Sequence, residues 1–235
     1  MNWVRRLYRS SIGAKWAMAL SGVLLFVFLI GHLAGNLQIF AGAEQLNHYA
    51  QSLRDLGPIL WIVRIGLIVV ALVHVFTALR LVRANEAARP VAYAFRADRQ
   101  IKPQTRLMWT SGLVLLGYTL FHLAHLTWGF VYHQNFTAET KLTDGRLVHD
   151  VYAMTVRGFQ VWWVTGAYVV AMVFLWFHLA HGIPSFFQTL GINHPKHDGA
   201  IRALGPAIAT LFFVGYASIP IMIWLGRVTL PGSAP

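Results

Sequence analysis

The first long apolar stretch of the chain decides its fold: residues 16–43 read WAMALSGVLLFVFLIGHLAGNLQIFAGA. It contains no Lys, Arg, Asp or Glu, and it exceeds the roughly 20 residues that a helix needs to cross the hydrocarbon core of a bilayer. Basic residues before it and Ala41-Gly42-Ala43 at its end imitate a secretory signal. The apolar run is longer than a signal core of about 7 to 15 residues. The stretch is therefore predicted to be a retained membrane-spanning helix.

The composition of the whole chain agrees with a membrane protein. Of its 235 residues, 57% are hydrophobic and 11% are charged, whereas soluble domains carry about 25% charged residues. Four further apolar stretches follow the first. The sequence predicts an all-α integral membrane fold, one domain over residues 1–235, with five transmembrane helices at about 16–40, 57–82, 107–132, 160–187 and 203–226. No long block of like charge is present, so no nucleic-acid partner is expected.

Basic residues determine the predicted orientation, because connections rich in Lys and Arg stay in the cytoplasm. Thirteen of them fall on the side of the N-terminus, seven of those between the second and third spans, and six fall on the other side. This asymmetry predicts a cytoplasmic N-terminus and a C-terminus outside. The net charge of +11 is attributed to the same asymmetry and to contact with anionic lipid headgroups.

Histidines inside the predicted spans are the candidate functional residues. Ionisable side chains within a bilayer are costly and usually functional. The spans contain no Asp or Glu, and the chain has no cysteine, which disfavours carboxylate metal sites, thiolate sites and covalently attached haem. A b-type haem with two histidine ligands fits best, and the alternative is that single histidines bond to neighbouring helices. Six of the eleven histidines are concerned: His32, His74, His122, His125, His178 and His181.

Depth along the helices pairs four of these histidines, because two ligands of one haem must lie at one level on facing helices. At 1.5 Å per residue, His32 and His122 each lie roughly 24 Å from the cytoplasmic ends of their spans. His74 and His178 lie roughly 9 Å and 14 Å from the cytoplasmic edge. The sequence therefore predicts an outer haem between His32 and His122 and an inner haem between His74 and His178.

Two helices offer a choice of ligand, because Phe-His-Leu-Ala-His occurs at 121–125 and again at 177–181. Residues three apart share a helix face. By this reasoning His125 and His181 remain alternative ligands, or partners of a propionate, a quinone oxygen or a neighbouring helix.

Further residues surround these histidines in a recognisable order. They are Leu29-Ile30-Gly31-His32-Leu33 with Asn36, Val73-His74 between Gly66 and Arg80, Thr110-Ser111-Gly112 ahead of His122, and His178 followed by Gly182, Ser185-Phe186 and Leu190-Gly191-Ile192. Over five spans the chain resembles the diheme cytochrome b membrane-anchor subunit, of the single-anchor type with five helices, of succinate dehydrogenase and fumarate reductase. The resemblance implies one axial ligand per helix and selects His122 over His125 and His178 over His181.

The resemblance also implies partners and a role. Such subunits anchor a flavoprotein subunit and an iron–sulfur subunit on the cytoplasmic side of a bacterial-type inner membrane. They carry electrons between these partners and a membrane quinone, here expected to be menaquinone, through two b haems. Dicarboxylate chemistry would belong to the flavoprotein and not to this chain. The basic second connection, with Tyr93 and Phe95, fits a docking surface, and the alternative is a solvated basic loop that follows the orientation rule.

Two groups of polar residues complete the expected site. Arg64, inside the second span, is expected to pair with a propionate of the outer haem, and Arg80, near His74, with a propionate of the inner haem. The quinone candidates follow the first span on the outer side, where they could exchange the proton of quinone redox chemistry. They are Glu44, His48, Arg54 and Asp55.

Two other functions remain as alternatives. One is the cytochrome b subunit of another respiratory oxidoreductase, such as a nitrate reductase or hydrogenase, in which the histidines are concentrated on fewer helices. The other is a histidine-lined transporter, which predicts broken helices, inverted repeats or polar cavities.

Overall fold

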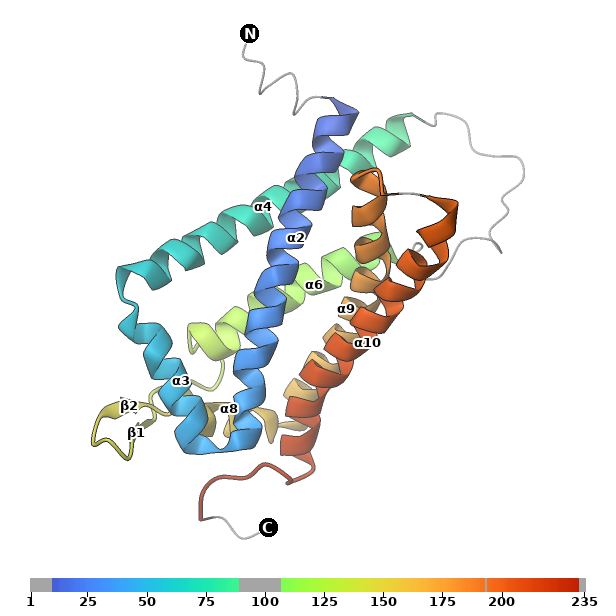
Figure 1. Ribbon diagram of the computed structural model, residues 1–235. Helices are drawn as coiled ribbons and strands as arrows, with labels where there is room; N and C mark the ends of the chain where they lie inside the picture. The colour runs from blue at the N-terminus through green and yellow to red at the C-terminus, as the bar shows by residue number, and fades with distance from the viewer. Residues whose placement is uncertain (1–9, 89–106, 193, 233–235) are drawn as a thin grey trace.

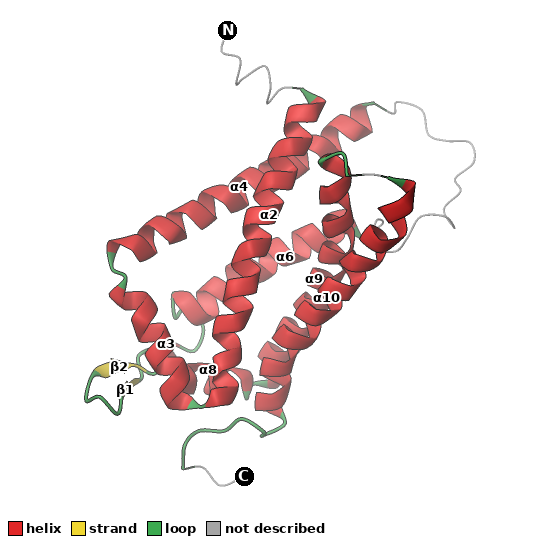
Figure 2. Ribbon diagram, in the orientation of Figure 1, coloured by secondary structure: helices red, strands yellow, loops and turns green. Residues whose placement is uncertain are grey.

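A computed structural model describes residues 10–88, 107–192 and 194–232 of the chain. Long helices run side by side as a bundle (Figure 1), and helix is the dominant secondary structure (Figure 2). The chain enters α2 at one end of the bundle and leaves α10 at the other. The long helices are α2 (Ser11–Asn36), α4 (Pro58–Ala87), α6 (Met108–His122), α9 (Trp162–Thr189) and α10 (Pro195–Trp224).

Four helical segments are long and apolar enough to cross a membrane: Ser11–Ala41, Pro58–Ala87, Trp162–Thr189 and Pro195–Trp224. The first joins α2 to a short 3₁₀ segment, η1 (Leu37–Ala41). Among the described residues the chain is therefore an all-α protein apart from one small hairpin, with the lengths and apolar character of membrane helices.

The third predicted span, 107–132, is shorter than expected. Its regular α-helix ends at His122 and continues only as one π-helical turn, η3 (Leu123–Thr127). The amide of Trp128 donates to the carbonyl of Leu123, five residues back, at 2.8 Å, and the amide of Phe130 donates to the carbonyl of Ala124. In this π turn the hydrogen bonds span five residues or more, and the α-helix does not resume after Thr127.

Capping residues and prolines determine where the helices begin. The hydroxyl of Ser10 accepts from the amide of Gly13 at 2.9 Å and caps α2. Gly57, with φ of +54°, permits the turn into Pro58, the first residue of α4. Pro195 begins α10 earlier than the predicted residue 203, because proline needs no partner for an amide proton at a helix start.

Two connections in which the sequence predicts no helix or strand contain short secondary-structure elements. α3 (Ala43–Asp55) follows the first span. The connection after α6 forms α7 (His133–Phe136), the antiparallel strands β1 (Glu139–Lys141) and β2 (Leu147–His149), and α8 (Val151–Phe159). We call these elements together, α3, α7, β1, β2 and α8, the hairpin end. In Figure 1 α3, α8 and the two strands lie at the end of the bundle at which α10 ends.

The core lies between α9, α10 and α8, and α4 stands apart from it. Gly205 on α10 lies so close to α9 that a Cβ atom there would stand 2.7 Å from the carbonyl oxygen of Ala180. α4 packs chiefly on α2 and exposes Ile62, Ile68 and Phe76 along its length. Large apolar side chains directed outward are what a helix facing lipid requires.

Part of the expected docking surface lies outside the described residues. This holds for Arg89, Arg96, Arg99, Lys102 and Arg106 of the second connection and for Tyr93 and Phe95. Arg5, Arg6 and Arg9, which were counted for the orientation, also lie outside the described residues.

Candidate functional site

Two histidines from α2 and α6 face each other. The ring centres of His32 and His122 are 5.8 Å apart, with the ring planes at 89°. Phe28 stacks on His32 with ring centres 5.1 Å apart. Tyr216 of α10 lies 6.1 Å from His32, and its hydroxyl donates to the carbonyl of Leu29 at 2.8 Å. The aromatic rings of α2, α6 and α10 thus surround the His32–His122 pair.

The second pair comes from α4 and α9. The ring centres of His74 and His178 are 6.2 Å apart, with the planes at 62°. Nδ1 of His74 lies 3.2 Å from the hydroxyl of Ser21 on α2, and Nδ1 of His178 lies 3.3 Å from the hydroxyl of Ser111 on α6. Both serines are buried. Four helices therefore meet at the His74–His178 pair.

The two pairs lie at different levels of the bundle. On α2, Ser21 contacts the His74–His178 level, and His32, eleven residues later, belongs to the other level. Eleven helical residues rise roughly 16 Å. The same spacing separates Ser111 from His122 on α6. The structure thus brings together the two pairs of rings that the depth argument pairs, while their role as haem ligands stays a prediction.

The distance between the rings fits a metal shared by two imidazoles. Ring nitrogens bind first-row metals at about 2 Å, so two imidazoles on opposite sides of one metal have ring centres about 6 Å apart. The described residues form no group of three or more His, Cys, Asp or Glu suited to a metal ion. The available ligand set at each level is therefore a pair of histidines, the set that b-type haem uses.

A buried hydroxyl also lies near the His74–His178 pair. Thr77 follows His74 by three residues on α4 and has no exposed surface. Its Oγ1 has no hydrogen-bond partner among the described residues. Buried polar atoms are normally paired, so a group bound beside His74 would find a donor there.

His125 is held in a buried contact of its own. It is 3% exposed, and its Nδ1 lies 3.0 Å from the hydroxyl of Tyr168 on α9. The same hydroxyl lies 3.3 Å from Nδ1 of His122. Gly158 of α8 lies against the opposite side of the ring, where a Cβ atom would stand 2.6 Å from Nε2 of His125. His125 is thus packed between α8 and α9.

His181 is bonded within its own helix. Its Nε2 lies 3.2 Å from the hydroxyl of Ser185, and that hydroxyl also donates to the carbonyl of His181 at 2.8 Å. His178, one turn earlier, is the residue whose ring approaches His74.

The two arginines expected at the propionates lie on α4. The guanidinium of Arg64 stands 5.1 Å from the centre of the Trp61 ring, a cation–π contact within one helix. Arg80 is half-buried, six residues from His74. Propionate binding by either residue stays a prediction.

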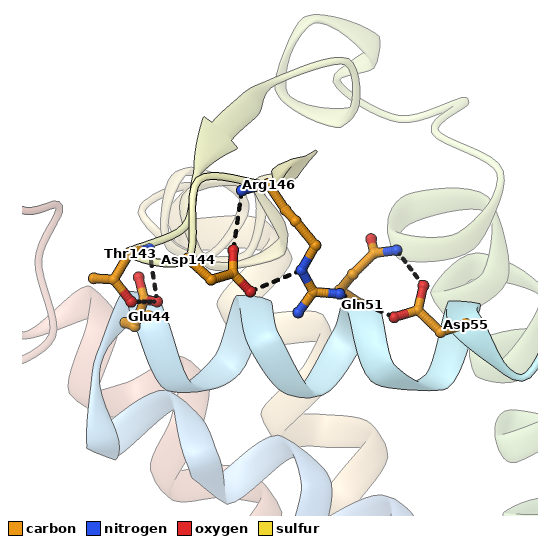
Figure 3. Close-up of polar contacts among 6 residues, drawn as sticks. All are labelled: Glu44, Gln51, Asp55, Thr143, Asp144 and Arg146. Atoms are coloured by element: carbon orange, nitrogen blue, oxygen red, sulfur yellow. Dashed lines mark hydrogen bonds and ion pairs between the residues drawn. The ribbon is translucent and has the colours of Figure 1, made fainter.

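The quinone candidates all lie on α3, at the hairpin end. Both the amide and the hydroxyl of Thr143 donate to Oε1 of Glu44, at 3.0 and 2.6 Å. Asp55 pairs with Arg146 at 3.1 Å, and Arg146 also pairs with Asp144 at 2.7 Å. Figure 3 shows these contacts joining α3 to the loop between β1 and β2. Glu44 and Asp55 thus hold the hairpin, while His48 and Arg54 are exposed.

These contacts shift the acid–base behaviour of the hairpin end. Hydrogen bonds from Thr143 lower the pKa of Glu44. Hydrogen bonds from Arg146 lower the pKa of Asp144. Burial, with the charge of Arg54 as the next cause, lowers the pKa of His149. The hydrogen bonds favour the charged form of the two carboxylates, and burial favours the neutral form of the imidazole.

Ser21 and Tyr168 are not among the site residues predicted from the sequence, and Ser111 belongs there only to a stretch that carries the family resemblance. A usable signal was present for the serines. Ser-Gly stands eleven residues before His-Leu-Ala both in α2 and in α6. No comparable pattern marks Tyr168.

Comparison of the chain with models of known protein families, with curated proteins and with solved structures gave no match.

Proposed function

We propose that the chain is the membrane-anchor subunit of a succinate:quinone oxidoreductase, binding two b haems between its histidine pairs. Two pairs of imidazoles from four helices, with ring centres 5.8 and 6.2 Å apart, carry this proposal. Bound haem would supply one-electron transfer. In this proposal α6 with η3 is a fifth membrane-spanning helix, and the start of α2 lies on the cytoplasmic side.

In this proposal the protein would hold two haem positions at different levels of an apolar bundle. His32 and His122 would supply the ligands of the outer haem, and His74 and His178 those of the inner haem. The two levels lie roughly 16 Å apart along α2, and in this proposal the inner position would face the cytoplasmic side and the outer position the hairpin end. Arg80 would neutralise an inner propionate and Arg64 an outer one.

The partners follow from the direction of this path. A flavoprotein subunit and an iron–sulfur subunit would dock on the cytoplasmic side, where succinate oxidation or fumarate reduction would take place outside this chain. A quinone, expected to be menaquinone, would exchange electrons at the opposite side, near α3. The site of action is proposed to be a bacterial-type inner membrane.

The test is a visible difference spectrum, reduced minus oxidised, of the purified complex, together with a pyridine haemochrome count. Two b haems per chain, with a flavin-containing and an iron–sulfur subunit in the same complex, are expected. Two haems without a flavin-containing partner would favour the cytochrome b subunit of another oxidoreductase. A purified complex that contains no haem would overturn the proposal and favour the transporter alternative.

A further inference from the structure

Two buried serines contact the two histidines of the inner pair, and His74 is in addition hydrogen-bonded to the backbone of Met18. The Ser21 hydroxyl lies 3.2 Å from Nδ1 of His74, and the Ser111 hydroxyl lies 3.3 Å from Nδ1 of His178. Each serine belongs to a different helix from the histidine it contacts. Ser21 is 4% exposed and Ser111 is 0% exposed, so water does not compete for these contacts.

The direction of each hydrogen bond follows from the single proton of a hydroxyl group. The Ser21 hydroxyl donates to the carbonyl of Ala17 at 2.7 Å, and the Ser111 hydroxyl donates to the carbonyl of Met108 at 3.0 Å. Both distances are shorter than the distances to the histidines. Each serine oxygen is therefore left to accept a proton from Nδ1–H of its histidine. In that tautomer Nε2 carries the free lone pair that a metal needs.

The sequence repeats this device in two helices. Residues 21–34 read SGVLLFVFLIGHLA, and residues 111–124 read SGLVLLGYTLFHLA. Eleven residues are close to three helical turns, so the serine and the following histidine of each helix share one face. α2 and α6 thus each provide one histidine to the outer pair and one hydroxyl to the inner pair.

The glycine after each serine leaves room for the histidine ring. A Cβ atom on Gly22 would stand 3.4 Å from Cε1 of His74, and one on Gly112 would stand 3.9 Å from Cε1 of His178. Both are ordinary van der Waals distances, so each ring packs against the glycine that follows its serine.

The outer pair is held differently. Nδ1 of His122 meets the hydroxyl of Tyr168, which it shares with His125. His32 is stacked on Phe28. Paired serine acceptors are thus a feature of the His74–His178 level.

We propose that Ser21 and Ser111 are positioning residues that fix the tautomer and orientation of His74 and His178 and lower the reduction potential of the inner haem. This inference rests on the proposed function. An acceptor on Nδ1–H makes the imidazole a stronger base toward iron. A more basic ligand stabilises the ferric state relative to the ferrous state, so removing the acceptor raises the potential of that haem.

The test is a redox titration of the haems in the intact complex, comparing wild type with Ser21→Ala, Ser111→Ala and the double variant. Each single variant is expected to change the reduction equilibrium constant of the inner haem about threefold in favour of reduction, which is about 28 mV for a one-electron couple. The outer haem is expected to keep its potential. Ser21→Thr retains a hydroxyl and is expected to restore the wild-type value.

Ser218→Ala is the matched control, because the hydroxyl of Ser218 on α10 also donates to a carbonyl of its own helix, at 2.8 Å. Unchanged inner potentials in both alanine variants, or an equal shift in Ser218→Ala, would overturn the inference. Loss of the inner haem alone in Ser21→Ala, with recovery in Ser21→Thr, would support it. Loss of both haems would contradict it, because the serines contact one level only.

The haem count of the wild type separates this inference from the proposed function. A wild-type complex without haem would contradict both the proposed function and this inference. If the wild type binds two haems and the serine variants have unchanged reduction potentials, only this inference is contradicted.

Discussion

The hydroxyl of Tyr168 on α9 lies 3.0 Å from Nδ1 of the buried His125. Tyr168 is itself only 5% exposed. Tyr168→Phe keeps the ring and removes the hydroxyl, which leaves a buried imidazole nitrogen without this partner. The expected loss of stability is about 1–3 kcal/mol, read as a lower thermal unfolding midpoint in detergent. A Phe variant as stable as the wild type would show that the contact contributes nothing.

The proposed ligand set predicts which haem each substitution removes. His74→Ala or His178→Ala is expected to remove the inner haem and leave the outer one, because each eliminates one of two ligands at that level. His32→Ala or His122→Ala is expected to do the reverse. A pyridine haemochrome count combined with a redox titration distinguishes the two results.

The matched controls for this set are His125→Ala and His181→Ala, which are expected to leave both haems bound. His181 is bonded to Ser185 on its own helix, whereas His178 approaches His74. A complex that loses a haem in His181→Ala and keeps both in His178→Ala would reverse the ligand assignment on α9.

Asn47 joins α3 to α8 and is expected to stabilise the hairpin end. Its side chain donates to Asp150 at 2.9 Å and accepts from the amide of Tyr152 at 2.9 Å, and the residue is 2% exposed. Asn47→Ala removes both bonds, one of them to a charged group, at an expected cost of about 2–4 kcal/mol. Thermal unfolding measures the loss. Gln45→Ala, which removes an exposed contact with Gln38, is the control and should change little.

Acid is expected to loosen the hairpin. The pKa values of Glu44 and Asp144 are lowered by their hydrogen bonds. A carboxyl group with a lowered folded pKa stabilises the fold fully above its unfolded value, about 4, and loses that contribution as the pH falls through the folded value. Hydrogen exchange at the amides of Thr143 and Arg146, corrected for the intrinsic rate, should become faster as the pH falls below about 4. Glu44→Gln should flatten the response at Thr143, and an unaltered response there would refute the role of Glu44.

Glu44 is also a quinone candidate, and the same substitution tests it. Gln at position 44 keeps an oxygen that can accept from Thr143 and removes the carboxylate that could exchange a proton. We expect Glu44→Gln to slow quinone turnover without changing the haem count. Unchanged turnover would remove Glu44 from the candidates and leave it as a hairpin contact.

The membrane-spanning helices and the pairing of the histidines were predictable, because each depends only on the length of an apolar run or on the helical rise per residue. The apolar runs of α2, α4, α9 and α10 exceed the length of a bilayer crossing, so their helical state followed from composition. The meeting of His74 with His178 followed from the rise per residue and the alternating direction of successive helices. Both features follow from numbers of residues along the sequence alone.

Features that depend on particular contacts were not predictable in this way. The π turn after His122 depends on which carbonyl accepts from Trp128. The fold of the hairpin end depends on Asn47 reaching Asp150, 103 residues away in the sequence. The contact of Tyr168 with His125 depends on the rotation of α9 about its axis. Such details are decided by packing, for which hydropathy has no signal.

Because α4 depends chiefly on α2 for its packing, a bound cofactor would affect how the bundle assembles. α4 packs chiefly on α2, while both histidine pairs join the α2–α4 hairpin to the α6–α9 half of the bundle. A cofactor bound between the histidines of each pair would link these two parts of the bundle. Binding to the joined state alone stabilises that state by mass action. Binding of the cofactor would then stabilise the assembled bundle, in addition to providing for electron transfer.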